Sequence, residues 1–246
     1  MNKAIPKKLN VEPLVEAVFE IRFQGSSLAS NALLGYLISK LGNLSLTRLP
    51  ASDIPQLLRE QNPNFKYLPL FKASWKEYSI LIGDWMCAIT TNIPYPGWDN
   101  FKATIMELAE YLENSKLISK VERYSLKYVD ILEAEKTQEQ LDLIKFQIQL
   151  GDYDIKKEPI NLRIELSENH FLHVVQIISN SILEERGKTI KKGLLINIDS
   201  LVNNPTNNFW NSLSESLEEI HTASKNLFFN FLKKETITSL EPIYET

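Results

Sequence analysis

Two short stretches with the same pattern indicate the fold: residues 18–23, which read VFEIRF, and residues 123–128, which read RYSLKY. In both, every second residue is apolar or aromatic, and most residues between these are polar or charged. Alternation with a period of two is typical of a strand that buries one face. We therefore expect the apolar residues of VFEIRF to face a core, while Glu20 and Arg22 point to the opposite side of a sheet.

Each stretch is followed by the same order of elements. After a strand at 14–23, the spacing of apolar residues predicts a helix at 28–41, a strand at 44–49, strands at 67–74 and 77–92 with a turn at Gly83-Asp84, and a helix at 98–115. The proline-rich segment 50–63 is expected to hold one helical turn. After a strand at 123–132, the pattern predicts a helix at 137–144, strands at 146–153, 160–167, 171–179 and 193–201, and a helix at 208–233.

This shared order predicts a duplicated unit. We expect an α+β protein of two tandem strand–helix–strands–helix units, residues 1–120 and 121–246, that form one curved antiparallel sheet with helices on one face. The layout resembles the saddle of TATA-binding-protein-like folds, and a likeness of layout carries no function with it. The alternative is a chance similarity between two ordinary α+β segments.

The composition argues against several classes of function. The formal net charge is −4, whereas nucleic-acid binders usually carry a basic excess, so a nucleic-acid contact would have to come from a local patch. The single cysteine excludes an intramolecular disulfide. No apolar run reaches the length of a membrane span, and the first residues do not read as a secretory signal. We expect a cytoplasmic protein.

Three motifs carry a family resemblance: PLVEAVFEIRF at 13–23, GWDNF at 97–101 and RYSLKYVDI at 123–131. They resemble an uncharacterised, sporadically distributed bacterial family of about this length, and the similarity extends over nearly the whole chain. The chain has Lys127 where the family favours Arg, which loses the bidentate guanidinium, and Asp130 where the family favours Asn. The resemblance implies no established activity. Its sporadic distribution resembles that of defence-associated or mobile-element genes.

The strongest candidate for a binding surface is the sheet face that points away from the core. Alternation along the strands places a set of mostly charged residues there, namely Glu20, Arg22, Arg123, Lys127, Arg163, Glu165, Asn197 and Asp199. One reading is a solvated face whose charges neutralise each other in cross-strand pairs. The other is a surface that recognises a polar partner, and its mixed sign favours a protein over a phosphate backbone.

Two smaller features are also open to two readings. The basic hairpin Arg186, Lys188, Lys191 and Lys192 is either a solubilising tip or a contact for nucleic acid or an acidic protein. Tyr95 and Trp98 lie in a turn, where they either anchor a partner or pack against the helix that follows.

Catalytic and metal-binding motifs are missing from the sequence. Gly187-Lys188-Thr189 ends like a phosphate-binding loop, but Ile182 replaces the first glycine of that motif. His170 and His173 fall on opposite sides of a predicted strand, which does not suit one metal ion. Cys87 lies in an apolar strand, where a buried and inert thiol is expected. We expect no metal and no cofactor.

Together these features predict a non-catalytic binding or assembly protein. It would be a subunit of a bacterial defence-associated or mobile-element system that recognises a protein partner, or a second copy of itself, through the open sheet face. The alternative is a nucleic-acid-binding protein that uses the sheet or the basic hairpin, and a third reading is a hydrolase with an unrecognised site. No membrane contact is expected.

Overall fold

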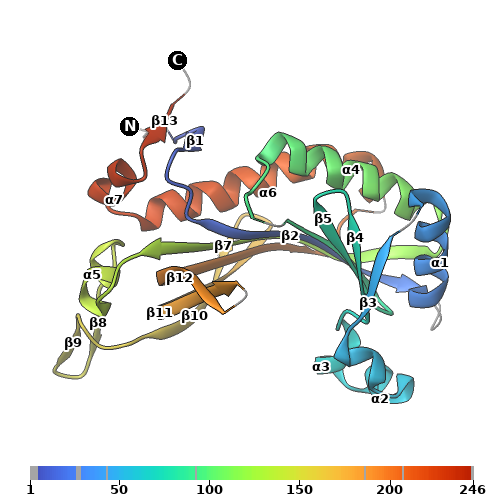
Figure 1. The fold of residues 1–246 in the computed structure, drawn as a ribbon, viewed down its shortest axis with the longest axis horizontal. Coiled ribbons are helices and arrows are strands. Elements are labelled where there is room, and N and C mark those ends of the chain that lie inside the picture. The colour runs from blue at the N-terminus through green and yellow to red at the C-terminus, as the bar shows by residue number, and fades with distance from the viewer. Residues whose placement is uncertain are drawn as a thin grey trace. The chain divides into compact units, whose positions relative to one another are not determined.

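A nine-stranded open antiparallel sheet with helices packed on it makes this an α+β protein, as predicted (Figure 1). The computed structural model describes residues 5–25, 29–42, 44–91, 93–185, 187–206 and 208–244. The strands follow each other across the sheet in the order β10-β11-β12-β7-β2-β6-β5-β4-β3. Their bounds are β2 Leu14–Gly25, β3 Ser45–Arg48, β4 Phe71–Trp75, β5 Tyr78–Ile82, β6 Met86–Thr91, β7 Ile118–Glu133, β10 Asn161–Glu168, β11 Phe171–Glu185 and β12 Lys188–Asn203.

Helices and two small strand pairs make up the rest of the regular structure. The helices are α1 Ala29–Leu41, the 3-10 helix η1 Pro50–Asp53, α2 Gln56–Gln61, α3 Pro63–Lys66, α4 Trp98–Asn114, α5 Thr137–Asp142, α6 Phe209–Phe231 and α7 Lys234–Ser239. The strand pairs are β1 Lys8–Leu9 with β13 Pro242–Ile243, and β8 Ile148–Leu150 with β9 Tyr153–Ile155. Along the described ranges, no helix combines the length and the apolar character that crossing a bilayer requires.

The chain divides into two compact units. Unit 1 comprises residues 1–15, 128–200 and 221–246, and unit 2 comprises residues 16–127 and 201–220. Both are built from interleaved segments, so β2, β7, β12 and α6 each contribute residues to both units. The predicted boundary at residues 120 and 121 falls within β7; the two tandem repeats stay a prediction.

In unit 2, helices α1 and α4 cover one face of the sheet (Figure 1). Gly97 has a φ of 90°, which favours glycine, and it ends the turn from which α4 starts. The apolar stripe of α4 is buried against the strands, and Phe101 and Ile105 are fully buried. Phe23 from β2 and Leu33 from α1 complete this core. The predicted alternation of β2 is therefore confirmed.

Helices α2 and α3 lie on the other side of the unit 2 sheet from α4 (Figure 1). This segment holds more helix than the single turn expected at 50–63. Pro50 and Pro63 each start a short helix, where the missing N–H costs nothing. The nearly buried Arg59 ties α2 to Asp84 in the β5–β6 turn, with Nε 2.8 Å from Oδ2.

In unit 1, the core lies between β10–β12 and the second half of α6. Val175 from β11 and Leu194 and Ile196 from β12 are fully buried, and they belong to one hydrophobic cluster with Phe228 of α6 and with Leu232, which directly follows α6. The predicted strands at 160–167, 171–179 and 193–201 are present, although β11 and β12 are longer than predicted. The helix predicted at 28–41 is found as α1, and Leu28 lies outside the described residues.

Candidate functional site

The face of the unit 2 sheet opposite α1 and α4, called here the open face, carries a group of interacting polar side chains. Along β2, Phe19, Ile21 and Phe23 are at most 4% exposed, and Glu20 and Arg22 between them point the other way. Glu16 and Gln24 continue the same period of two on β2. The polar cluster defined by the contacts below comprises Glu16, Glu20, Arg22, Gln24, Tyr67, Glu122, Arg123 and Lys127.

Glu20 holds the centre of the polar cluster. Its Oε1 lies 2.7 Å from Nε of Arg22 and 3.7 Å from Nη2 of Arg123. The exposed fractions are 19% for Glu20, 27% for Arg22 and 19% for Arg123. One carboxylate shared by two guanidinium groups at this depth is stronger than a pair of exposed charges, because water screens it less. The three side chains therefore support one another's positions.

Tyr67 and Glu122 extend the polar cluster along the strands. The Arg22 guanidinium lies 4.3 Å from the centre of the Tyr67 ring, which is a cation–π contact. The Tyr67 hydroxyl lies 3.5 Å from Oε2 of Glu122, and Nε2 of Gln24 donates to Oε1 of the same carboxylate at 2.7 Å. The segment that leads out of α3 thus contributes directly to the open face.

Glu16 and Lys127 form a second ion pair of the polar cluster, with Nζ 2.8 Å from Oε2. Their exposed fractions are 41% and 30%, so this pair is more accessible than the one at Glu20. The carboxylates of Glu16, Glu20 and Glu122 equal in number the cations of Arg22, Arg123 and Lys127. The polar cluster therefore has both signs of charge and no formal net charge.

The other residues predicted for the open face belong to unit 1. Arg163 and Glu165 point away from the unit 1 core, with Nη2 of Arg163 2.7 Å from Oε1 of Glu165 and both side chains at least half exposed. Asn197 and Asp199 alternate with the buried Ile196 and Ile198 on β12. Within the described residues, Oδ1 of Asn197 is buried and accepts no hydrogen bond.

Sequence reasoning found four members of the polar cluster: Glu20, Arg22, Arg123 and Lys127. It missed Glu16. Because Glu16 is an even number of residues from Glu20 and Arg22 on β2, strand alternation could have placed it on the same face. Glu122 lies directly beside Arg123, and alternation alone assigns these neighbours to opposite faces. Tyr67 approaches from a different part of the chain, and no local pattern marks it.

The basic hairpin is only partly described. Arg186 lies outside the described residues, and Lys188 is exposed at the start of β12. Lys191 donates to the backbone oxygen of Glu12, and Nζ of Lys192 lies 2.7 Å from Oε2 of Glu135. Two of the four predicted basic residues are thus already engaged by unit 1 itself.

The groups with catalytic or metal-binding potential are dispersed. Cys87 is 1% exposed, and burial raises the pKa of its thiol to about 12, which keeps it protonated. His173 is fully buried, and its Nδ1 lies 2.7 Å from the Ser200 hydroxyl. Burial lowers the pKa of the His173 imidazole. Nδ1 of His221 lies 2.8 Å from the Tyr128 hydroxyl. Among the described residues, no three His, Cys, Asp or Glu side chains are grouped as a metal site would need.

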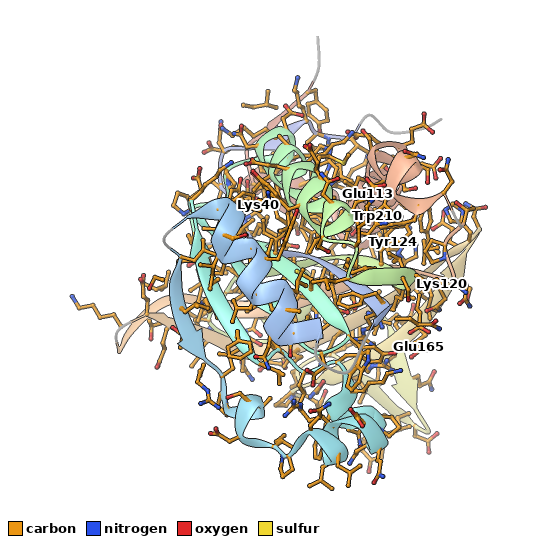
Figure 2. The ribbon with its side chains drawn as sticks, turned by 90° about the vertical axis from the view of Figure 1, so that its right-hand side faces the viewer. Lys40, Glu113, Lys120, Tyr124, Glu165 and Trp210 are labelled. Carbon is orange, nitrogen blue, oxygen red and sulfur yellow. The ribbon has the colours of Figure 1, made fainter. Side chains whose placement is uncertain are left out.

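A shallow hollow of about 280 Å³ lies beside α4 in unit 2. Figure 2 shows Glu113 and Trp210 next to each other at the end of α4, where both line this hollow. Glu107 and Glu110 add two further carboxylates to its wall, and Glu107 is paired with Lys76. None of the residues of the polar cluster lines it.

The turn aromatics Tyr95 and Trp98 contact other parts of unit 2. The Tyr95 ring meets the Phe101 ring edge-on at 6.2 Å between centroids, and Nε1 of Trp98 donates to Oε2 of Glu218 at 3.1 Å. These contacts agree with a packing role at the start of α4.

No protein-family model matches the sequence, and no curated protein matches it at a significant level.

Proposed function

We propose that this chain is a non-catalytic binding or assembly protein that recognises a protein partner through its open face, at the polar cluster. The observation that carries the proposal is the balance of charge in that cluster, where carboxylates and cations are partly buried and bonded to one another. A surface of mixed sign selects among partners, because only a complementary pattern of charges avoids like-charge contacts.

A phosphate backbone suits the polar cluster poorly. Arg22 and Arg123 already hold Glu20, so a phosphate that bound them would lie against that carboxylate. Glu16 and Glu122 would add further repulsion on both sides. A polypeptide can place an acid against Lys127 and a base against Glu16, which a uniformly anionic chain cannot do.

The sharpest test exchanges the two charges of the most accessible pair. The double variant Glu16→Lys/Lys127→Glu keeps an ion pair on the sheet but reverses the polarity that a partner meets. Exposed pairs contribute about 0.2–1 kcal/mol, so the melting temperature should stay nearly unchanged. Cross-linking and affinity purification from the native host would identify the partner, and titration of the purified partner should show at least about tenfold weaker binding.

The matched control is Lys76→Glu/Glu107→Lys, which exchanges a similarly exposed pair between the β4–β5 turn and α4. This variant should bind the identified partner as wild type does. Unchanged affinity of the Glu16→Lys/Lys127→Glu variant would refute the role of the polar cluster.

The alternative function, nucleic-acid binding through the basic hairpin, rests on Lys188 and its neighbours. Because Lys191 and Lys192 are engaged by Glu12 and Glu135, few charges remain for phosphate. Retention of the wild-type protein on duplex DNA and on single-stranded RNA columns separates the two functions. Binding that falls steeply between about 50 and 200 mM salt would favour the alternative.

We also propose that the chain arose by tandem duplication, with the sheet curved as a saddle. The strand order supports the duplication. Outward from the β7–β2 pair, it runs β12, β11, β10 on one side and β6, β5, β4 on the other. In both directions a repeat's first strand lies beside the last sheet strand of the same repeat, and this shared order supports the proposal, although β3 extends one side beyond β4 and has no counterpart beyond β10.

A further inference from the structure

We propose that the free edge of β10 pairs antiparallel with β10 of a second copy of this chain, with Ile164 at the centre. This inference goes beyond the proposed function, because β10 lies wholly in unit 1 and contains no residue of the polar cluster. An edge strand with unpaired backbone groups is a template for another strand.

The first argument is the regularity of β10. All eight of its residues pair with β11 in one unbroken register, from Asn161 opposite Ile178 to Glu168 opposite Phe171. The strand contains no proline and no bulge that would block further pairing. β10 ends the strand order of the sheet, and within the described residues no backbone bond reaches it from the side away from β11.

The second argument is the direction of the backbone groups. The backbone oxygen of Ile160 accepts from the N–H of Ser179 at 3.0 Å, so residue 160 directs its groups toward β11. Successive residues alternate in an extended strand. Arg163 and Glu165 therefore present their N–H and C=O groups to the free edge, and Ile164 between them does not.

The third argument is that β10 is complementary to itself. In an antiparallel pair centred on Ile164, Arg163 of each copy lies opposite Glu165 of the other, and both backbones present the required groups there. Leu162 then lies opposite Leu166, on the same side as the Ile164 pair. Ile164 and Leu166 are half-buried at the margin of the unit 1 core, so a second β10 would continue the apolar layer.

Other registers are less favourable. Centring the pair on Arg163 or on Glu165 places like charges directly opposite each other, which is destabilising. A shift by one residue brings charged side chains onto the apolar side. Centring on Leu162 places Glu165 opposite Pro159, which has no N–H to donate. Of these registers, the sequence NLRIELSE favours the one centred on Ile164.

Charge exchange tests the pairing. Arg163→Glu or Glu165→Arg alone converts both cross-copy pairs to like charge, and the exposed fractions of 58% and 50% mean that the fold should tolerate either change. Sedimentation velocity from about 1 to 200 µM should show a monomer–dimer equilibrium for wild type and a dissociation constant at least about tenfold higher for each single variant. The double variant Arg163→Glu/Glu165→Arg should restore the wild-type constant.

Cysteine cross-linking tests the register even if a charge variant folds poorly. Ile164→Cys should form a disulfide-linked dimer under mild oxidation, because opposed residues of a pair without backbone bonds have their Cβ atoms about 4.5–5.5 Å apart. Leu166→Cys should not, since its opposite residue is Leu162. The native Cys87 is 1% exposed and should not contribute. A wild-type protein that stays monomeric up to 200 µM, a dimer insensitive to both single reversals, or equal cross-linking at positions 164 and 166 would each overturn the proposal.

Discussion

Asp130 is a carboxyl group in an environment that opposes its charge. It is 6% exposed on β7, and burial, helped by the Glu12 carboxylate, raises its pKa well above the ordinary 3.8, against a smaller opposing effect of Lys191. A raised folded-state pKa means that folding favours the protonated form. The stability that this group contributes is complete below the unfolded pKa and is lost as the pH rises through the folded pKa.

We therefore expect Asp130→Asn to stabilise the protein at pH 7. The melting temperature should rise by at least ~2 °C, the shift that about 1 kcal/mol produces in a chain of this size. The gain should shrink as the pH falls toward 4, because the carboxyl group then becomes increasingly protonated in the unfolded state as well. Thermal unfolding at several pH values measures this, with the exposed Asp142→Asn as control. A gain that is equal at pH 4 and pH 7 would contradict the assignment.

Cys87 should be unreactive in the folded protein. Burial raises the pKa of its thiol to about 12, so the reactive thiolate does not form at neutral pH. The side chain is also only 1% exposed, so a reagent cannot reach the sulfur. A chromogenic disulfide reagent at pH 8 should label it only at the rate of unfolding, and completely in denaturant. Leu150→Cys, at a position that is 70% exposed, should react at once. Rapid labelling of folded wild type would show that Cys87 is accessible.

At the scale of elements, Arg59 anchors α2 to the β5–β6 turn. It pairs with Asp84, which is 3% exposed and also accepts a hydrogen bond from Ser30 at 2.6 Å. Arg59→Met leaves a buried carboxylate without its cation, so we expect a loss of about 3–5 kcal/mol in the free energy of unfolding by urea. Adding Asp84→Asn should recover part of this loss.

Arg48→Met is the matched control in the same segment. Arg48 pairs with Asp53 at 3.5 Å, but the two side chains are 70% and 82% exposed. Its loss should cost less than about 1 kcal/mol. Equal effects of Arg48→Met and Arg59→Met would mean that burial of the Asp84 pair contributes nothing.

These contacts also show which elements could be predicted from the sequence. β2, α1, α4 and α6 follow from apolar periodicity, because each buries one face against a core. Segment 50–67 could not be predicted as fully, because Arg59–Asp84 and Arg22–Tyr67 join residues far apart in the chain. The polar cluster was predictable where its residues follow the alternation of a strand, as Glu20 and Arg22 do. It was not predictable at Tyr67, which reaches the open face from outside the sheet.

At the scale of the whole molecule, the two units share elements. The chain passes from one unit to the other inside β2, β7, β12 and α6. Each of these four crossings therefore lies within a strand or a helix and not within a linker. Unfolding one unit must therefore break strands and a helix on which the other unit depends. Domains that unfold independently usually meet at exposed linkers with few crossing contacts.

We accordingly expect one cooperative thermal transition for the whole chain, with a calorimetric enthalpy equal to the van't Hoff enthalpy. One destabilising change in each unit tests this. Arg59→Met perturbs unit 2. Gly193→Ala perturbs unit 1, because a Cβ at residue 193 would collide with the Leu132 backbone oxygen, at a cost of about 3 kcal/mol. Both variants should move the same transition to lower temperature without splitting it. Two separate transitions, each moved by only one of the variants, would show that the units fold independently despite their shared elements.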